Sequence, residues 1–97
     1  MKMAEMESKP TARGFSRFEF SDRNQVSCSL QQSSLATESA IWLGCNAADP
    51  QVLVPGEGWK PVPMPEGYIA NTRMHLTQDQ VKALLPHLQR FAETGEL

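Results

Sequence analysis

The stretch TQDQVKALLPHLQRFAETG, from Thr77 to Gly95, decides the fold, because it carries the clearest helix pattern in the sequence. Thr77 begins a capping box, in which its hydroxyl can accept from the backbone N–H of Gln80 while the Gln80 side chain reaches back. Apolar residues then recur at helical spacing and form one continuous stripe: Val81, Leu84, Leu85, Leu88, Phe91 and Ala92. Gly95 is a typical residue to follow a helix C-terminus. We therefore predict one amphipathic helix at the end of the chain.

Pro86 opposes this helix. In mid-helix it removes a backbone donor and its ring presses on the carbonyl of Lys82, at a cost of about 3 kcal/mol. Burying each large apolar side chain of the stripe contributes roughly 1.5 to 3 kcal/mol, so burial can outweigh the proline. We expect the helix to obtain that burial by lying across one face of a sheet.

The residues before the helix carry the two-residue period of half-buried strands. Phe18 and Phe20 alternate with charged residues, and after the polar turn residues 22–24 the same period returns in residues 25–31. These two segments predict a β-hairpin. The apolar run 40–45 and the alternating residues 68–76 predict two further strands, and residues 52–54 a short edge strand.

Length and composition limit the fold to one small domain. The chain has 97 residues, of which 40% are hydrophobic and 21% charged, and its mean hydropathy is −0.40. We predict an α+β fold, in which a small antiparallel sheet of three to five strands carries the C-terminal helix on one face. Residues 1–12 show no sustained apolar face and are expected to form a disordered tail, which leaves residues 13–97 as the domain.

Charge and hydropathy also restrict the function. Nine basic and eleven acidic residues give a net charge of −2 and a pI near 5.6, which does not indicate a globally basic nucleic-acid binder. The N-terminal residues MKMAEME lack the apolar core of a secretory signal, and no window approaches the roughly 20 apolar residues that cross a bilayer. We expect a cytoplasmic protein that does not use a membrane.

Residues 46–67 form a Pro/Gly-rich excursion, which holds five of the seven prolines. This composition excludes a helix and any central strand, and we expect an ordered excursion packed on the domain. Trp59 offers a large apolar area to a protein partner, with Lys60, Met64 and Tyr68 beside it. Trp59 could equally pin its own loop to the core, and the sequence leaves both interpretations open.

The cysteines and histidines have the residue types of a zinc site, but not the spacing. Among Cys28, Cys45, His75 and His87, no pair is separated by the two to five residues of a zinc finger or ribbon. Two free thiols are the default, with a cross-strand disulfide as the alternative. No local motif joins a nucleophile to a base. We therefore expect no metal, no cofactor and no enzymatic activity.

Residues 13–20, RGFSRFEF, partly match the octamer of RNA-recognition domains. Arg17 replaces the central stacking aromatic residue, and too few residues precede the octamer for that fold. A hairpin strand with core phenylalanines is the favoured interpretation. Weak single-stranded nucleic-acid binding through Arg13, Phe15, Arg17 and Arg23 is the alternative function.

Four strings resemble a family of small uncharacterised proteins encoded by bacteriophages and prophages: SSLATE (33–38), AIWLG (40–44), TRMHLT (72–77) and ETGEL (93–97). The resemblance covers residues 14–97, although the family often has a glycine in the first hairpin turn, where this chain has Asn24. The family has no assigned activity, so no catalytic residue is implied. The resemblance implies stoichiometric binding of a host protein, for example by an anti-CRISPR or other anti-defence inhibitor. A second copy could also cover spare apolar surface or a sheet edge as a homodimer.

Overall fold

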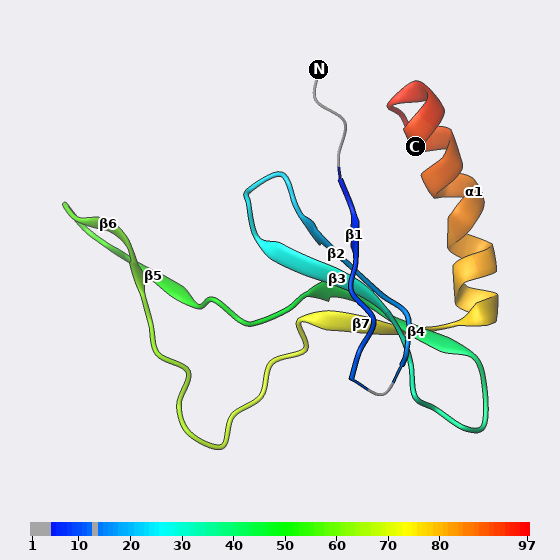
Figure 1. The fold of residues 1–97 in the computed structure, drawn as a ribbon. Coiled ribbons are helices and arrows are strands. Elements are labelled where there is room, and N and C mark those ends of the chain that lie inside the picture. Colours follow the sequence, from blue (N-terminus) through cyan, green and yellow to red (C-terminus); the bar gives the residue numbers. More distant parts are fainter. Residues whose placement is uncertain (1–4, 13) are drawn as a thin grey trace.

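The computed structural model describes residues 5–12 and 14–97. Its elements, in chain order, are β1 (Glu7–Ser8), β2 (Arg17–Ser21), β3 (Ser27–Gln32), β4 (Ala40–Cys45), β5 (Gln51–Val54), β6 (Gly58–Pro61), β7 (Arg73–Thr77) and α1 (Gln78–Thr94) (Figure 1). Five strands form one antiparallel sheet in the order β1-β2-β3-β4-β7, and β5 and β6 pair separately as a hairpin. The predicted α+β class, with a small antiparallel sheet and one C-terminal helix, is confirmed.

The predicted hairpin is β2 and β3, and Asp22 organises its turn. The carboxylate Oδ1 of Asp22 accepts from the backbone N–H groups of Asn24 at 2.8 Å and Val26 at 3.0 Å. Gln25 has a φ of 69°, in the left-handed region that glycine prefers. The turn therefore places its left-handed residue at Gln25, one position after Asn24.

Strand β4 approaches β7 unusually closely at Gly44. A Cβ atom at this position would lie 2.8 Å from the Cα of Arg73 and closer still to the carbonyl oxygen of Thr72. Gly44 also has a φ of 149°, and it lies opposite Arg73 in the sheet register. Only glycine fits this position without a shift of the β7 backbone.

The N-terminal segment differs from the expected tail in its described part. Glu7 pairs with Glu19 and Ser8 with Phe18, so β1 is an edge strand of the main sheet. Lys9 then donates its backbone N–H to the carbonyl of Arg17 at 2.7 Å. Short polar strands of this kind are common at sheet edges. Residues 1–4 of the expected tail lie outside the described residues.

The helix begins as predicted, because Thr77 and Gln80 form both hydrogen bonds of the capping box. The backbone N–H of Gln80 donates to the Thr77 hydroxyl at 3.1 Å, and that of Thr77 donates to the Gln80 side chain at 2.9 Å. Thr77 is also the last residue of β7, where it pairs with Ala40. No loop therefore separates the sheet from the helix, and Gly95 ends α1 in the left-handed conformation with φ 78°.

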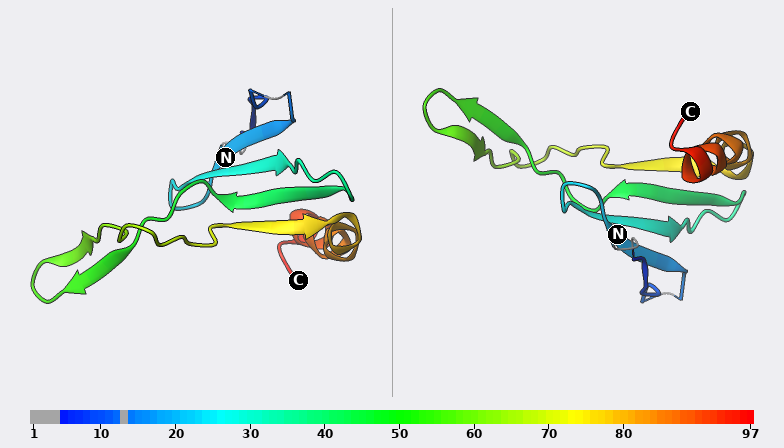
Figure 2. Two further views of the ribbon diagram at one scale, coloured as in Figure 1. Left: turned by 90° about the horizontal axis from the view of Figure 1, so that it is seen from below. Right: turned by 90° about the horizontal axis from the view of Figure 1, so that it is seen from above.

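The position of the helix differs from the expectation that it would lie across the sheet. Helix α1 rises from the end of β7 and points away from the sheet (Figure 1), and in the views along it the strands extend to one side (Figure 2). It buries none of its own residues. The physical reason lies in the direct β7–α1 junction, where Thr77, with φ −75° and ψ 165°, sets the direction in which the helix leaves the sheet.

The Pro/Gly-rich excursion also differs from the expectation that it would pack on the domain. The β5–β6 hairpin projects from the main sheet, and the chain returns to β7 through a wide loop (Figures 1 and 2). Strands β5 and β6 pair only with each other. The prolines explain this separation, since proline cannot donate a hydrogen bond to a neighbouring strand.

Candidate protein-binding surface

The β5–β6 hairpin holds its strands together through a tight turn with the sequence Val54-Pro55-Gly56-Glu57. The N–H of Glu57 donates to the carbonyl of Val54 at 3.0 Å, and Gly56 has a φ of 80°. Proline followed by a glycine with positive φ is the pattern of a type II turn. The Pro-Gly pair that excluded a helix in this region therefore builds a hairpin in its place.

Leu53 and Trp59 lie directly opposite each other on this hairpin, so their side chains share one face. Trp59 is 65% exposed and Leu53 is 57% exposed. The Trp59 indole is therefore exposed and does not pin the excursion to a core. It forms, with Leu53, an exposed apolar pair, which we call the hairpin pair.

The four residues predicted to bind a partner do not lie on one element. Lys60 pairs with Val52, so strand alternation places it on the hairpin face opposite Trp59. Met64 and Tyr68 lie on the loop that returns from β6 to β7, where both side chains are exposed. Trp59 is therefore the one predicted residue that shares a hairpin face with a second large apolar side chain.

Leu53 and Ile69 are exposed apolar residues that were not predicted from the sequence to bind a partner. Ile69 follows Tyr68 and is 92% exposed. The signal for Leu53 was present in the sequence: apolar residues flank the Pro-Gly turn at positions that pair across a two-stranded hairpin. The signal for Ile69 was absent, because alternation alone suggested a strand through residues 68–76.

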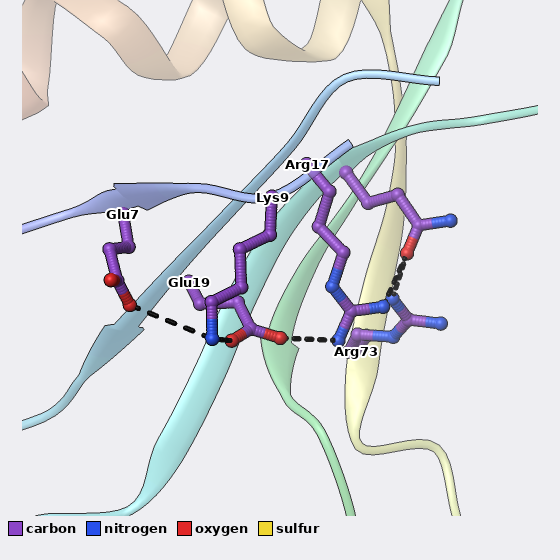
Figure 3. Close-up of polar contacts among 6 residues, drawn as sticks. Glu7, Lys9, Arg17, Glu19 and Arg73 are labelled. Carbon is purple, nitrogen blue, oxygen red and sulfur yellow. Dashed lines mark hydrogen bonds and ion pairs between the residues drawn. The ribbon is translucent and has the colours of Figure 1, made fainter. Parts of the chain in front are cut away.

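The face of the main sheet directed away from α1 carries a continuous polar network (Figure 3). Lys9 Nζ lies 3.7 Å from Glu7 and 3.3 Å from Glu19, and Glu19 also pairs with Arg17 at 3.3 Å. The hydrogen bond to Glu19 and its negative charge, and secondarily the charge of Glu7, raise the pKa of Lys9. Because these groups are partly or largely exposed, each ion pair contributes little to stability.

On the same face, Arg17 and Arg73 both donate to the Gln31 side chain, and Arg73 lies beside an aromatic stack. The rings of Trp42 and His75 are 3.8 Å apart and nearly parallel, at 6°, and the Arg73 guanidinium lies 5.4 Å from the Trp42 ring centroid. His75 Nε2 is 2.9 Å from the Ser33 hydroxyl. Each of these side chains has its contacts within the sheet: Trp42 with His75 and Arg73, and His75 with Ser33.

The cysteines lie on the other face. Cys28 and Cys45 pair across β3 and β4, with their free thiols 4.0 Å apart. Burial of Cys28, and secondarily the neighbouring Cys45 thiol, raises the pKa of the Cys28 thiol. His75 projects from the opposite face and His87 lies on α1, so the fold does not bring thiols and imidazoles together. No group of three or more potential metal ligands occurs in residues 5–12 and 14–97.

The cationic residues of the alternative nucleic-acid site are also dispersed. Arg17 begins β2 and pairs with Glu19, whereas Arg23 lies in the turn beyond the other end of the same strand. Phe15 precedes β2, and Arg13 lies outside the described residues. Strand β2 thus separates the two described arginines by its full length.

No family model, curated protein or solved structure matches this chain. Within the part of the chain that the structure describes, no helix combines the length and hydropathy needed to cross a bilayer. The hairpin pair of Leu53 and Trp59 is therefore the candidate site that rests most directly on the geometry of the chain itself.

Proposed function

We propose that this chain is a non-enzymatic binding protein that recognises a protein partner through the hairpin pair, with Trp59 as the anchor. The observation that carries the proposal is the exposure of Leu53 and Trp59 on one face of a projecting hairpin. Tryptophan is enriched among residues that dominate binding energy, because it buries a large area with few rotatable bonds.

The surroundings of the hairpin pair support recognition of a protein surface. Met64, Tyr68 and Ile69 add exposed apolar side chains on the return loop. A hairpin held by a Pro-Gly turn is already ordered, so little conformational entropy is lost when it binds. Lys60 lies on the other hairpin face and is not part of the hairpin pair.

We also propose a class of partner and a cellular compartment. The resemblance to bacteriophage and prophage proteins favours a host protein in the bacterial cytoplasm, bound stoichiometrically. Inhibition of a defence system, including a CRISPR effector, is the biological role we propose for such binding. This assignment of a role rests on the resemblance, whereas the assignment of the binding residues rests on the geometry of the hairpin.

The test is affinity capture from host lysate, followed by titration of the captured protein in purified form. Trp59→Ala should weaken binding by about 2 kcal/mol or more, roughly 30-fold. Leu35→Ala is the matched control, since Leu35 is an exposed apolar residue in the β3–β4 loop, on another part of the surface. If Trp59→Ala binds as tightly as Leu35→Ala and the unmodified chain, the hairpin pair is not the binding site.

A second titration, with single-stranded nucleic acid at increasing salt, tests the alternative function. Binding dominated by phosphate contacts weakens steeply with salt, whereas an interface anchored by an apolar residue does not. We expect no measurable affinity for single-stranded nucleic acid even at low salt. Affinity that falls with salt and with Arg23→Ala, and is unaffected by Trp59→Ala, would favour the alternative.

A further inference from the structure

The main sheet has an apolar face that, among the described residues, only the start of α1 meets. Strand alternation and register place the following side chains on this face: Phe18, Phe20, Cys28, Leu30, Ile41, Leu43, Cys45, Met74 and Leu76. Cys28 is the buried member of the set, and Met74 is 53% exposed. In the described part of the chain, Cys28 and Ala40 are the only buried apolar residues. A folded sheet of this composition normally buries one face.

Helix α1 presents a second uncovered apolar surface. Leu84, Leu85, Leu88 and Phe91 of the predicted stripe are 37 to 55% exposed. The start of the stripe meets the apolar face of the sheet, where Val81 and Leu85 line a groove of about 340 Å³ with Ile41 and Leu76. Beyond that point α1 leaves the sheet, so the helix and the apolar face form the two sides of an open angle (Figure 1).

The β7–α1 junction holds this angle open. Thr77 is fixed on one side by its pairing with Ala40 and on the other by the capping box with Gln80. No loop separates Thr77 from Gln78, so the backbone at this junction sets the angle between α1 and the sheet. Both surfaces are therefore open to a second molecule.

The exposed area of the chain is large for its mass. The chain exposes 8323 Å², about one and a half times the roughly 5,500 Å² expected for a folded monomer of 10.8 kDa. Its radius of gyration is 16.5 Å, against about 12.5 Å for a compact domain of this length. An obligate dimer buries on the order of 1,000 Å² or more from each copy. The excess surface is about 2,800 Å², and the helix stripe and sheet face share it with the projecting β5–β6 hairpin.

We propose that two copies of this chain form a two-fold dimer in which α1 of each copy lies in the open angle of the other and covers its apolar sheet face. A second copy fits because one chain supplies both halves of the contact. An isologous interface pairs surface i with surface j and surface j with surface i, so one rotation covers two helices and two sheet faces. The net charge of −2 per chain adds little repulsion between copies. This interface is separate from the hairpin pair, which stays exposed.

The first test measures mass and stability of the full chain. Light scattering coupled to size-exclusion chromatography should give twice 10.8 kDa, and the melting temperature should rise with protein concentration, because dimerisation is linked to folding. A mass of one chain across the micromolar range overturns the proposal.

The second test introduces a charge on each side of the helix. Leu88→Glu places a carboxylate in the apolar stripe and should abolish the dimer, whereas Ala83→Glu places the same charge on the far side of α1 and should retain it. If Leu88→Glu remains a dimer, the helix stripe is not the interface.

The third test locates the contact without a substitution, and so applies even if Leu88→Glu does not fold. In a mixture of isotope-labelled and unlabelled chains, filtered NOE spectra should connect methyl groups of Leu85 and Leu88 in one copy with those of Ile41 and Leu43 in the other. A dimer whose intermolecular NOEs lie instead along the β7 edge or on the β5–β6 hairpin would contradict this arrangement. Trp59→Ala should leave the mass unchanged, so the dimer and the proposed partner binding can fail independently.

Discussion

Arg73 donates from Nη1 to Oε1 of Gln31 over 2.9 Å, although β4 lies between their two strands. The side chain crosses beside Gly44, the residue opposite Arg73 on β4, which has no side chain. The same Gln31 oxygen accepts from Nη1 of Arg17 at 3.1 Å. One neutral amide therefore lies between two guanidinium groups from opposite parts of the sheet.

Replacing this amide by a carboxylate should stabilise the sheet. Gln31→Glu should increase the free energy of unfolding by on the order of 1 kcal/mol, because hydrogen bonds between ionised partners are stronger than those to a neutral acceptor. Urea denaturation at low salt measures the gain, which should shrink as salt screens the charges. In an Arg73→Met background the gain should fall by about half. A loss of stability, or a gain that is independent of Arg73, would contradict the shared-acceptor geometry.

The β2–β3 turn offers a second stabilising change. Gln25 adopts a φ of 69°, which costs a residue with a side chain about 1 kcal/mol relative to glycine. Gln25→Gly should therefore raise the free energy of unfolding by up to about 1 kcal/mol. Asn24→Gly is the matched control, and it should lower stability slightly by increasing the freedom of the unfolded chain. The opposite ranking of the two variants in thermal denaturation would place the left-handed residue at Asn24.

The close approach of β4 and β7 predicts a severe effect at Gly44. Gly44→Ala would force its Cβ against the backbone of Thr72 and Arg73, and should cost about 3 kcal/mol or more. Gly67→Ala is the matched control, since Gly67 also has a positive φ, 82°, but has open space around its Cβ position. That variant should lose only about 1 to 2 kcal/mol. Equal losses in chemical denaturation would show that backbone conformation, and not the β4–β7 contact, sets the requirement at Gly44.

Stability should fall at alkaline pH through Cys28. Its pKa is raised in the folded state above the ordinary value of 9.0, mainly by burial. A raised pKa means that the folded state holds its proton more tightly than the unfolded state, so this contribution is complete below pH 9 and is lost as the pH rises through the folded-state pKa. Urea denaturation between pH 8 and pH 10 should show a steeper loss of stability for the unmodified chain than for Cys28→Ala. Parallel curves would exclude Cys28 as the titrating group.

Several elements could be predicted from the sequence because their causes are local. The alternation of Phe18 and Phe20 with charged residues identified the first hairpin strand, and the Thr77–Gln80 capping box fixed the start of α1. Trp59 was selected as an anchor for its size and setting, and its exposure is consistent with that choice. The partner strand β6 was missed, because the prolines and glycines that marked the region as a loop also build the Pro-Gly turn.

By itself, the sequence determined the period of each element, the two faces of the sheet and the caps of the helix, since these depend on residues within one or two turns of each other. Only the tertiary structure decided that α1 leaves the sheet, that Gly44 lets β7 approach β4, and that the hairpin projects alone. These features depend on the absence of a loop after Thr77 and on backbone distances between segments far apart in the chain. Alternation shows that a surface needs covering, but the element that covers it is set by the direction in which the chain leaves the sheet.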